Sequence, residues 1–241
     1  MVLSPRRTPD ERLRLGASVV RVRPWPDDPA TAQIVPLTPG IQPLVDEIGD
    51  LLEQLHRSGY RRVRTSALAP LERETFAAAG LAVVEELHLL RRSLSVPLPR
   101  PALPLRRPHG LSEAVAVDRA AFGPGWRLDE EGLRDACEAT PHHRVRVFGS
   151  PAVGYAVHGR ATRNGFVQRL AVHPLAQRRG VATALLLDGL RWLRRHRASD
   201  VLVNTQVGNA RAMTLYRQLG FEVLDERLQV LGGPLPLAAR A

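Results

Sequence analysis

The spacing of apolar residues divides most of the chain into short segments with either a helical or a strand period. After residue 110 this pattern predicts nine elements. In the stretch 181–197, the residues Ala182, Leu185, Leu186, Leu190 and Leu193 fall on one face of a helix. The predicted helices are 112–122, 129–139, 181–197 and 209–220, and the predicted strands are 143–149, 152–160, 165–172, 200–207 and 221–231. Strands and helices in this order indicate an α/β chain.

The first half of the chain repeats part of this order. We predict strands at 17–23, 31–37, 60–68 and 81–90, and helices at 42–59 and 70–80. A shift of about 140 residues pairs Val63 with Val203, Thr65 with Thr205 and Gly80 with Gly220. The identities are few, so the matched order of elements is the better argument for an internal repeat.

A proline-rich segment separates the two halves. Residues 93–110 include five prolines, which favour an extended, semi-rigid spacer. We therefore predict a flexible tail at 1–16, an N-terminal half at 17–95, a linker at 96–110, a second domain at 111–231 and a flexible tail at 232–241.

Composition narrows the class of protein. The 241 residues carry a formal net charge of +10, and all 34 cations are arginines. These arginines are scattered, with a modest cluster at 191–197, so a general preference for arginine explains them better than a nucleic-acid stripe does. Cys137 is the single cysteine, which excludes an intrachain disulfide and is best interpreted as a packing residue. We find no membrane-length apolar run and no signal peptide, and expect a cytoplasmic protein without a membrane partner.

The candidate chemistry lies where the strand 165–172 gives way to the helix at 181. A helix N-terminus presents unpaired backbone N–H groups and a partial positive charge. Gly180 and Ala182 are small enough for an anion to approach the backbone, and Arg178 and Arg179 add full charges. The chain lacks the Lys-Ser/Thr of a Walker loop and any G-x-G-x-x-G, which disfavours ATP and NAD. A pyrophosphate of another cofactor fits this junction.

Two blocks carry a family resemblance. The pattern [QR]-x-x-G-x-[GA] occupies 177–182, and the block "NARAMTLYRQLGFE" follows at 209–222. Together they resemble the GNAT superfamily of acetyl-CoA-dependent N-acetyltransferases over about 112–231. The resemblance implies a mixed central sheet flanked by helices, with a degenerate, incomplete GNAT-like half before it as a pseudo-repeat. It also implies acetyl-CoA as cosubstrate, an amine acceptor and no metal.

The resemblance assigns roles to particular residues. The backbone of Leu170, Ala171 and Val172 would bind the pantetheine arm, and Arg178, Arg179, Gly180, Val181, Ala182 and Thr183 would hold the pyrophosphate. Asn209 would contact the cofactor near its pantetheine, and Tyr216 would act as general acid at the thioester sulfur. From the residues alone, Asn209 is a plausible N-cap and Tyr216 could be a core aromatic.

The general base is missing from this pattern. Neither 167–172 nor 201–207 contains a carboxylate, and the position where some family members have a glutamate is Asn204 here. Asn204 and Gln206 share one strand face and could hold a water. His158 and His173 are bases by pKa alone, although His173 fits a structural role beside Pro174. The alternatives are a water-relayed base or an acceptor amine with a low pKa.

The first half should not bind the cofactor. Its counterpart of the candidate junction, 36–45, has no Arg-Arg-Gly sequence and contains Pro43, which cannot donate an N–H. It would extend the sheet or shape the acceptor site. The competing functions are a non-catalytic acyl-CoA-binding module and, less favoured, a basic nucleic-acid binder. The acceptor amine and the choice between monomer and homodimer stay open.

Overall fold

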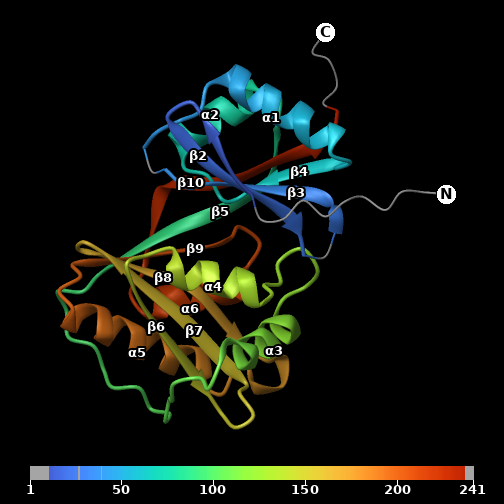
Figure 1. Ribbon diagram of the computed structural model, residues 1–241. Coiled ribbons are helices and arrows are strands. Elements are labelled where there is room, and N and C mark those ends of the chain that lie inside the picture. Colours follow the sequence, from blue (N-terminus) through green and yellow to red (C-terminus); the bar gives the residue numbers. More distant parts are fainter. Residues whose placement is uncertain (1–10, 27, 39, 237–241) are drawn as a thin grey trace. The chain divides into compact units, whose positions relative to one another are not determined.

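The computed structural model describes residues 11–26, 28–38 and 40–236. The chain divides into two compact units (Figure 1). Unit 1 comprises the residues up to His88 and those from Asp225 onward, and unit 2 comprises Leu89–Leu224. Each unit has its own buried apolar clusters.

The divisions fall inside two long strands, β5 (Ala82–Ser93) and β10 (Glu222–Pro234), and differ from the predicted boundaries at 95 and 231. The cause is strand pairing that a local pattern does not show. Residues 232–234 of β10 pair antiparallel with β4 (Arg62–Thr65), so the end of the chain belongs with the N-terminal unit.

Unit 1 contains a sheet and two helices. Its elements are β1 (Glu11–Leu15), β2 (Ser18–Trp25), β3 (Asp28–Pro36), β4, α1 (Val45–Arg57), α2 (Pro70–Ala78) and its parts of β5 and β10. The strand order is β1-β2-β3-β4-β10-β5. β1, β2 and β3 form an antiparallel meander, whereas β4 is parallel to β3 because α1 carries the chain back between them.

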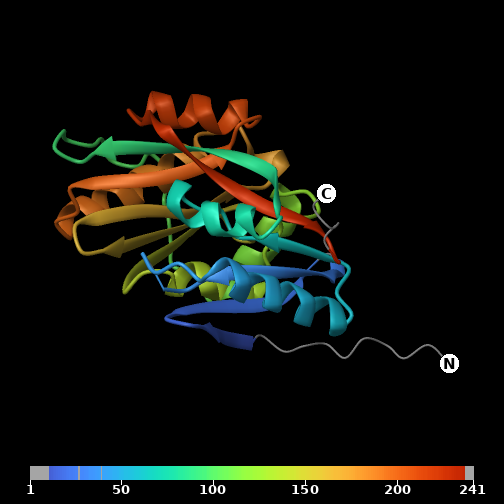
Figure 2. The ribbon, with the colours of Figure 1, turned by 90° about the horizontal axis from the view of Figure 1, so that it is seen from above.

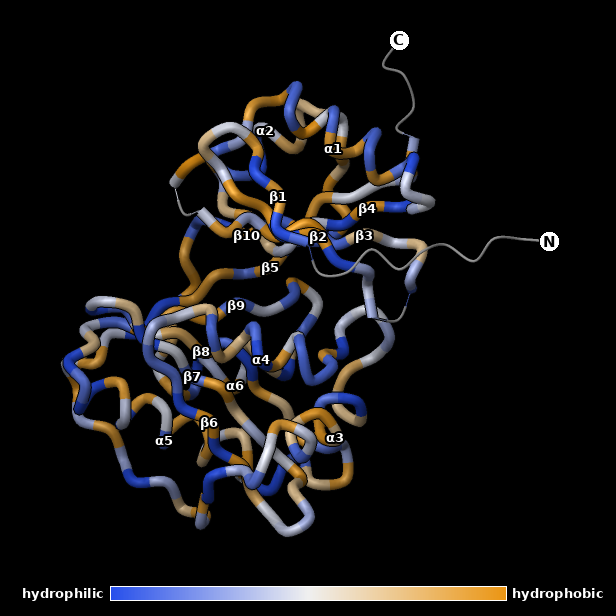
Figure 3. The backbone as a smooth tube through the Cα atoms, viewed as in Figure 1, coloured by the Kyte–Doolittle hydropathy of each residue, from blue (hydrophilic) through white to orange (hydrophobic). Residues whose placement is uncertain are grey.

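The core of unit 1 follows from the periodicity of α1. Its apolar residues Ile48, Leu51, Leu52 and Leu55 are buried, while its opposite face is polar (Figure 3). They pack in one cluster with strand residues and with Phe76 of α2. The amphipathic helix thus covers the apolar face of the strands.

Unit 2 contains the other strands of the ten-stranded sheet. Its strands are β6 (His142–Phe148), β7 (Gly154–Ala161), β8 (Asn164–Val172), β9 (Asp200–Gln206) and the end of β5, in the order β5-β9-β8-β7-β6. β6, β7 and β8 are antiparallel, and β9 runs parallel to β8. Its helices are α3 (Leu111–Ala121), α4 (Glu130–Glu138), α5 (Val181–Arg195) and α6 (Ala210–Gln218).

The helices of unit 2 cover both faces of this sheet (Figures 1 and 2). One cluster joins α3 and α4 to Tyr155 and Val157 of β7. Another joins α5 and α6 to Val167 of β8 and Val203 of β9. Cys137 is buried in the first cluster, as expected of a packing residue, and burial raises the pKa of its thiol.

A β-bulge in β8 changes which side chains face which helices. Val157 lies opposite Arg169 whereas His158 lies opposite Val167, so β8 has one extra residue, Gln168, at this point. Val167 packs in the cluster with α5, and Arg169 bonds to α3 on the other face. Simple alternation would have placed both on the same face.

The segment predicted as a linker does not separate the units. Residues 96–110 lie within unit 2, and Leu98 is buried in its core. The Arg191 guanidinium donates to the Leu98 carbonyl at 2.8 Å, and Arg106 forms an isolated bridge with Val147. The prolines do give an extended chain, but this chain packs along the unit because its leucines have apolar partners.

The predicted tails are corrected in part. Residues 11–15 of the predicted tail 1–16 form β1, and residues 232–234 of the predicted tail 232–241 belong to β10, followed by the buried Leu235. Residues 1–10 and 237–241 lie outside the described residues. The alternation of Leu13 and Leu15 with arginines was the available signal for β1.

The element order supports the predicted repeat. Residues 11–93 and 142–234 both contain three strands, a helix, a strand, a helix and a strand. α2 begins at Pro70 and ends at Ala78, and α6 begins at Ala210 and ends at Gln218, so both ends differ by 140 residues. In both stretches the first three strands are antiparallel and the fourth is parallel to the third.

Candidate active site

The junction between β8 and α5 is a tight turn with two left-handed residues. After β8 ends at Val172, a short 3-10 turn (Pro174–Ala176) leads to Arg178 with φ 61° and Gly180 with φ 77°. Gly180 is the N-cap of α5, and its left-handed backbone favours glycine there. The turn therefore leads directly into α5, and the N-cap Gly180 has no side chain to cover the first residue of the helix.

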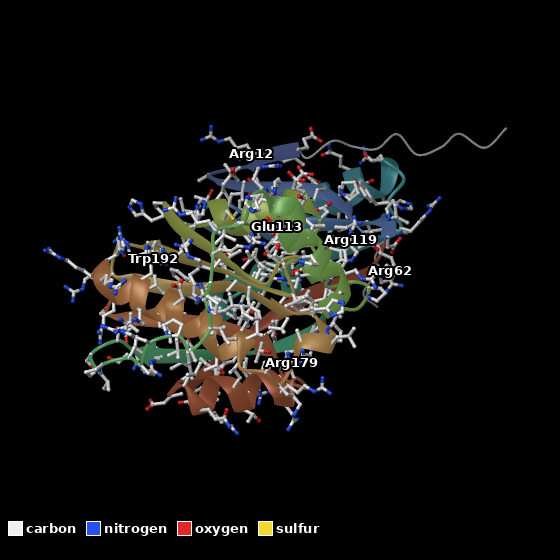
Figure 4. The ribbon with its side chains drawn as sticks, turned by 90° about the horizontal axis from the view of Figure 1, so that it is seen from below. Arg12, Arg62, Glu113, Arg119, Arg179 and Trp192 are labelled. Atoms are coloured by element: carbon white, nitrogen blue, oxygen red, sulfur yellow. The ribbon has the colours of Figure 1, made fainter. Side chains whose placement is uncertain are left out.

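The start of α5 is open. No side chain caps it, and its first turn contains no acidic residue. A Cβ at Gly180 would meet no described atom within 4 Å. Arg178 and Arg179 are exposed beside it, and Figure 4 marks Arg179. The free N–H groups of the first turn and the two guanidinium groups form a site suited to binding an anion.

Part of the predicted pyrophosphate segment is anchored in the core of unit 2. Val181 is buried against Ala156 and Leu185, which fixes the first turn to the sheet. Ala182 and Thr183 are half-buried. The six residues predicted to hold the pyrophosphate thus form one continuous turn, with its charged part exposed and its apolar part anchored.

β8 has an unpaired edge next to this turn. In the described chain, its parallel pairing with β9 covers only Asn164–Phe166 against Asp200–Leu202, although its antiparallel pairing with β7 continues to Val172. Beyond Phe166, the backbone groups of β8 that face β9 are therefore free to pair with another extended chain. Leu170, Ala171 and Val172 lie on this stretch.

α6 presents the other two predicted residues. The Asn209 side chain accepts a hydrogen bond from the Ala212 N–H at 3.1 Å, which confirms it as the N-cap. Tyr216 is 5% exposed and its ring lies 5.5 Å from that of Phe221. Burial raises the pKa of Tyr216, and the charge of Arg169 acts in the opposite direction. The phenol therefore stays protonated at neutral pH.

The candidate water-holding residues share one face of β9. Burial alternates along this strand, with Val201, Val203 and Thr205 buried. Asn204 is exposed and Gln206 is half-buried on the opposite face. No carboxylate occurs in the described stretches 167–172 and 201–206, as the sequence indicated.

Neither histidine fits a general base. His158 is 1% exposed beneath Gly189 of α5, and burial lowers its pKa to about 4. His173 accepts a hydrogen bond from the Leu175 N–H through Nδ1 at 3.3 Å, a structural role in the turn. The first is inaccessible to a substrate, and the second uses a ring nitrogen to hold the backbone.

Comparison with known proteins decides the family of this region. The model of the Acetyltransferase (GNAT) family matches residues 112–221, which include the α5 junction and the α6 block. Residues 112–221 are a GNAT domain. The match covers most of unit 2, and the fold class expected from the resemblance is confirmed.

Relatives and solved structures agree with this assignment. A mycothiol acetyltransferase of Acidothermus cellulolyticus is 34% identical over 185 residues, covering 61% of this chain and 56% of the relative. One of Mycolicibacterium gilvum is 30% identical, covering 64% and 57%. The chain thus matches a little over half the length of these relatives.

Solved structures match the fold over most of the chain. A tandem GNAT protein from the clavulanic acid biosynthesis pathway is 16% identical, with a TM-score of 0.62, over 92% of this chain and 81% of that one. A GCN5-related N-acetyltransferase from Kribbella flavida gives a TM-score of 0.60 at 16% identity, over 93% and 90%. At this identity the likeness concerns the fold.

The GNAT domain contains a buried ion pair that was not predicted from the sequence. Asp118 of α3 is fully buried and accepts bonds from Arg169 Nε at 2.8 Å and Nη2 at 3.0 Å. It also accepts from the Tyr155 hydroxyl at 2.5 Å and the Leu128 N–H at 2.7 Å. Four donors compensate the buried carboxylate. The signal in the sequence was an acidic residue among the apolar positions of the helix 112–122.

Arg169 ties the α3–α4 loop to β8. Its guanidinium also donates to the Trp126 carbonyl and lies 3.7 Å from the centre of the Phe122 ring. The loop between α3 and α4 is thereby fixed at two points against the strand that carries Leu170. Because Asp118 is fully engaged, it is not available as a general base.

Two negative findings concern the described residues. No group of three or more metal-ligating side chains is present among these residues. No described helix has the length and apolarity needed to cross a membrane. The arginines Arg12, Arg62, Arg119 and Arg179 that are labelled in Figure 4 come from four different segments.

Proposed function

We propose that the GNAT domain transfers an acetyl group from acetyl-CoA to a primary amine. The observation that carries this proposal is the open start of α5, with the left-handed Gly180 and the exposed Arg178 and Arg179. A helix terminus of this kind stabilises a diphosphate through backbone N–H groups, and the arginines add charge-assisted hydrogen bonds. Val181, Ala182 and Thr183 complete the turn.

The pantetheine arm would lie along the free edge of β8. Its two amide groups have the same hydrogen-bonding groups as an extended peptide. Leu170, Ala171 and Val172 can therefore bind it in the manner of an added strand where β9 no longer pairs. Asn209 uses its side-chain oxygen as the cap of α6 and keeps its amide N–H groups for the cofactor.

Tyr216 would act as the general acid. The acceptor nitrogen forms a bond to the acetyl carbonyl carbon, the carbon–sulfur bond breaks, and the sulfur leaves with the electron pair. The Tyr216 hydroxyl gives its proton to this thiolate, and the proton lost by the amine returns the phenol to its neutral form through solvent. The raised pKa of Tyr216 means that the phenol carries its proton at neutral pH.

Removal of the amine proton needs no carboxylate from β8 or β9. An α-amine, with a pKa of about 7.7–8.0, has a substantial neutral fraction at neutral pH, unlike a lysine-type amine at about 10.4. Asn204 and Gln206 could order a water that relays the proton. A rate profile without an enzyme group titrating between about pH 6 and 9 would favour an acceptor of low pKa over a relayed base.

The acceptor is tested first with the substrates of the relatives. The curated relatives are mycothiol acetyltransferases. We therefore place the amine substrate of those enzymes at the head of a panel that also contains amino acids, peptides, polyamines and aminoglycosides. Acetyl-CoA-dependent thiol release with one member of this panel identifies the acceptor class.

Unit 1 is proposed to bind no cofactor. At the start of its helix α1, the Glu47 carboxylate accepts a hydrogen bond from the Leu44 N–H at 2.8 Å, and Asp46 adds a second negative charge. The Glu47 carboxylate occupies the start of the helix, and the negative charges of Glu47 and Asp46 repel an anion that would bind there. Titration calorimetry with coenzyme A should therefore give one site per chain. Two sites would contradict this part of the proposal, and no heat at millimolar concentration would contradict the whole.

The catalytic role of Tyr216 is tested by Tyr216→Phe. We expect kcat to fall by about 100-fold, the lower end for loss of a general acid, with coenzyme A affinity retained. Tyr60→Phe is the matched control, because it removes a buried hydroxyl from unit 1 and should leave kcat unchanged. An unchanged kcat in Tyr216→Phe would remove this residue from the mechanism.

A second candidate function is a GNAT fold that binds acyl-CoA without turnover. It is favoured by the absence of a carboxylate in the described parts of β8 and β9 next to the free edge. Thiol release separates the two candidates. Binding of coenzyme A without release across the whole amine panel would support the binding module.

A further inference from the structure

One side chain connects the three elements of the proposed cofactor site. Gln177 immediately precedes Arg178, and its Nε2 donates to the carbonyl of Val172 at the end of β8, at 3.2 Å. Its Oε1 accepts a hydrogen bond from Arg211 Nη1 at 3.0 Å. Arg211 lies in the first turn of α6, two residues after Asn209. β8, the α5 turn and α6 therefore meet at a single amide.

This arrangement uses both ends of the Gln177 amide. The carbonyl of Val172 can only accept and the guanidinium of Arg211 can only donate, so the amide has one orientation that satisfies both. Because the Gln177 amide is neutral, its hydrogen bond does not neutralise the positive charge of Arg211. Within the described chain, Arg211 has no ion pair with a carboxylate.

The surroundings of Arg211 favour an anion. Neither α5 nor α6 has an acidic residue in its first turn. Arg211 is exposed, as are Arg178 and Arg179 in the turn that Gln177 begins. A guanidinium has five N–H donors, and the bond to Gln177 leaves others of Arg211 free for a phosphate oxygen.

We propose that Arg211 is a further ligand of the donor's diphosphate, and that Gln177 is a positioning residue that holds Arg211 beside the α5 turn. The inference rests on the proposed function and adds a residue from α6 to that site. It assigns Arg211 to the diphosphate, and not to the 3′-phosphate, because Gln177 joins it to the same turn that contains Gly180.

The first test measures binding by titration calorimetry with three ligands. Coenzyme A has both phosphate groups, dephospho-coenzyme A has only the diphosphate, and pantetheine has neither. For Arg211→Gln we expect about tenfold weaker binding of the first two, the loss of one charge-assisted hydrogen bond at a partly exposed site, and no change with pantetheine. Arg217→Gln is the control, since it removes the same charge from the exposed last turn of α6.

The outcomes are distinct. A loss with coenzyme A alone would overturn the assignment to the diphosphate, and equal losses in Arg211→Gln and Arg217→Gln would reduce the effect to net charge. Unchanged affinity in Arg211→Gln would overturn the inference while leaving the proposed function intact. If the unaltered protein binds no coenzyme A, the proposed function itself fails.

The positioning role of Gln177 is tested by a double-mutant cycle. In the Gln177→Ala background, Arg211 is no longer held, so the additional loss on Arg211→Gln should fall from about tenfold to less than threefold. Independent, fully multiplicative losses would refute the positioning role. Gln177→Glu provides a second reading, because a carboxylate would pair with Arg211 and repel the diphosphate, and should weaken binding more than Gln177→Ala does.

Discussion

Gly189→Ala tests the packing that holds α5 on the sheet. Gly189 lies in the middle of α5, and a Cβ there would come within 3.0 Å of three ring atoms of His158 on β7. The ring has little room to move, because His158 is 1% exposed and its strand is paired on both sides. The helix would have to move away from the sheet, or the ring would have to leave its place.

Two opposing terms set the magnitude. Alanine is favoured over glycine in a helix by about 1 kcal/mol. Restoring ordinary contacts of about 3.5 Å requires a shift of about 1.4 Å in a closely packed core, and overpacking of this kind costs about 3 kcal/mol. The net expectation is a loss of about 2 kcal/mol in the free energy of unfolding, or about 4–8 °C in Tm for a chain of this size.

Urea and thermal unfolding followed by circular dichroism measure this effect. Gly49→Ala is the matched control, since Gly49 lies in α1 with no described atom within 4 Å of its Cβ position, and should gain about 0.5–1 kcal/mol. In a His158→Ala background, Gly189→Ala should also become stabilising. A loss that persists in that background, or a gain equal to that of Gly49→Ala, would refute contact with the ring as the cause.

Three further predictions concern buried polar groups of unit 2. Burial lowers the pKa of the His158 imidazole from 6.5 to about 4. The folded protein keeps this ring neutral, so its full stability is present above pH 6.5, and about 3 kcal/mol is lost as the pH falls through 4. In urea unfolding at several pH values, the free energy of unfolding should decline less steeply with falling pH in His158→Asn. Asp118→Asn leaves the Arg169 charge buried without its anion and should cost about 3 kcal/mol in urea unfolding, partly recovered in Asp118→Asn/Arg169→Gln. Tyr155→Phe removes one donor to this carboxylate and should cost about 2 kcal/mol in the same assay.

The secondary structure could be predicted well where burial follows a single period. The helix expected at 181–197 is α5 at 181–195, and the strand expected at 165–172 is β8 at 164–172. The packed segment 96–110 and the division within β10 depend on pairing with residues far away in the chain, which a local window does not contain. β1 is different, because it pairs with the adjacent β2 and its alternating pattern was present in the sequence.

The candidate site divides in the same way. The turn at Gly180 and the Asn209 cap are local features, with backbone geometry and residue type linked over three or four positions, and both were available from the sequence. The Asp118–Arg169 pair joins residues 51 positions apart, and the Gln177–Arg211 bond joins residues 34 apart. The bulge at Gln168 further reverses the face on which Arg169 would be expected.

The two matching strand-to-helix junctions differ in whether the chain itself supplies negative charge at the start of the helix. Both follow the third strand of the repeated order of elements, so the fold alone does not distinguish them. At α1 the free N–H of Leu44 is satisfied by Glu47 from within the helix, and the chain stabilises its own helix terminus with its own negative charge. At α5 no side chain does this, and the terminus next to Gly180 is left to an outside partner. Loss of internal capping at a helix start costs about 1 kcal/mol of stability, and a diphosphate bound at α5, as proposed, would restore this stabilisation.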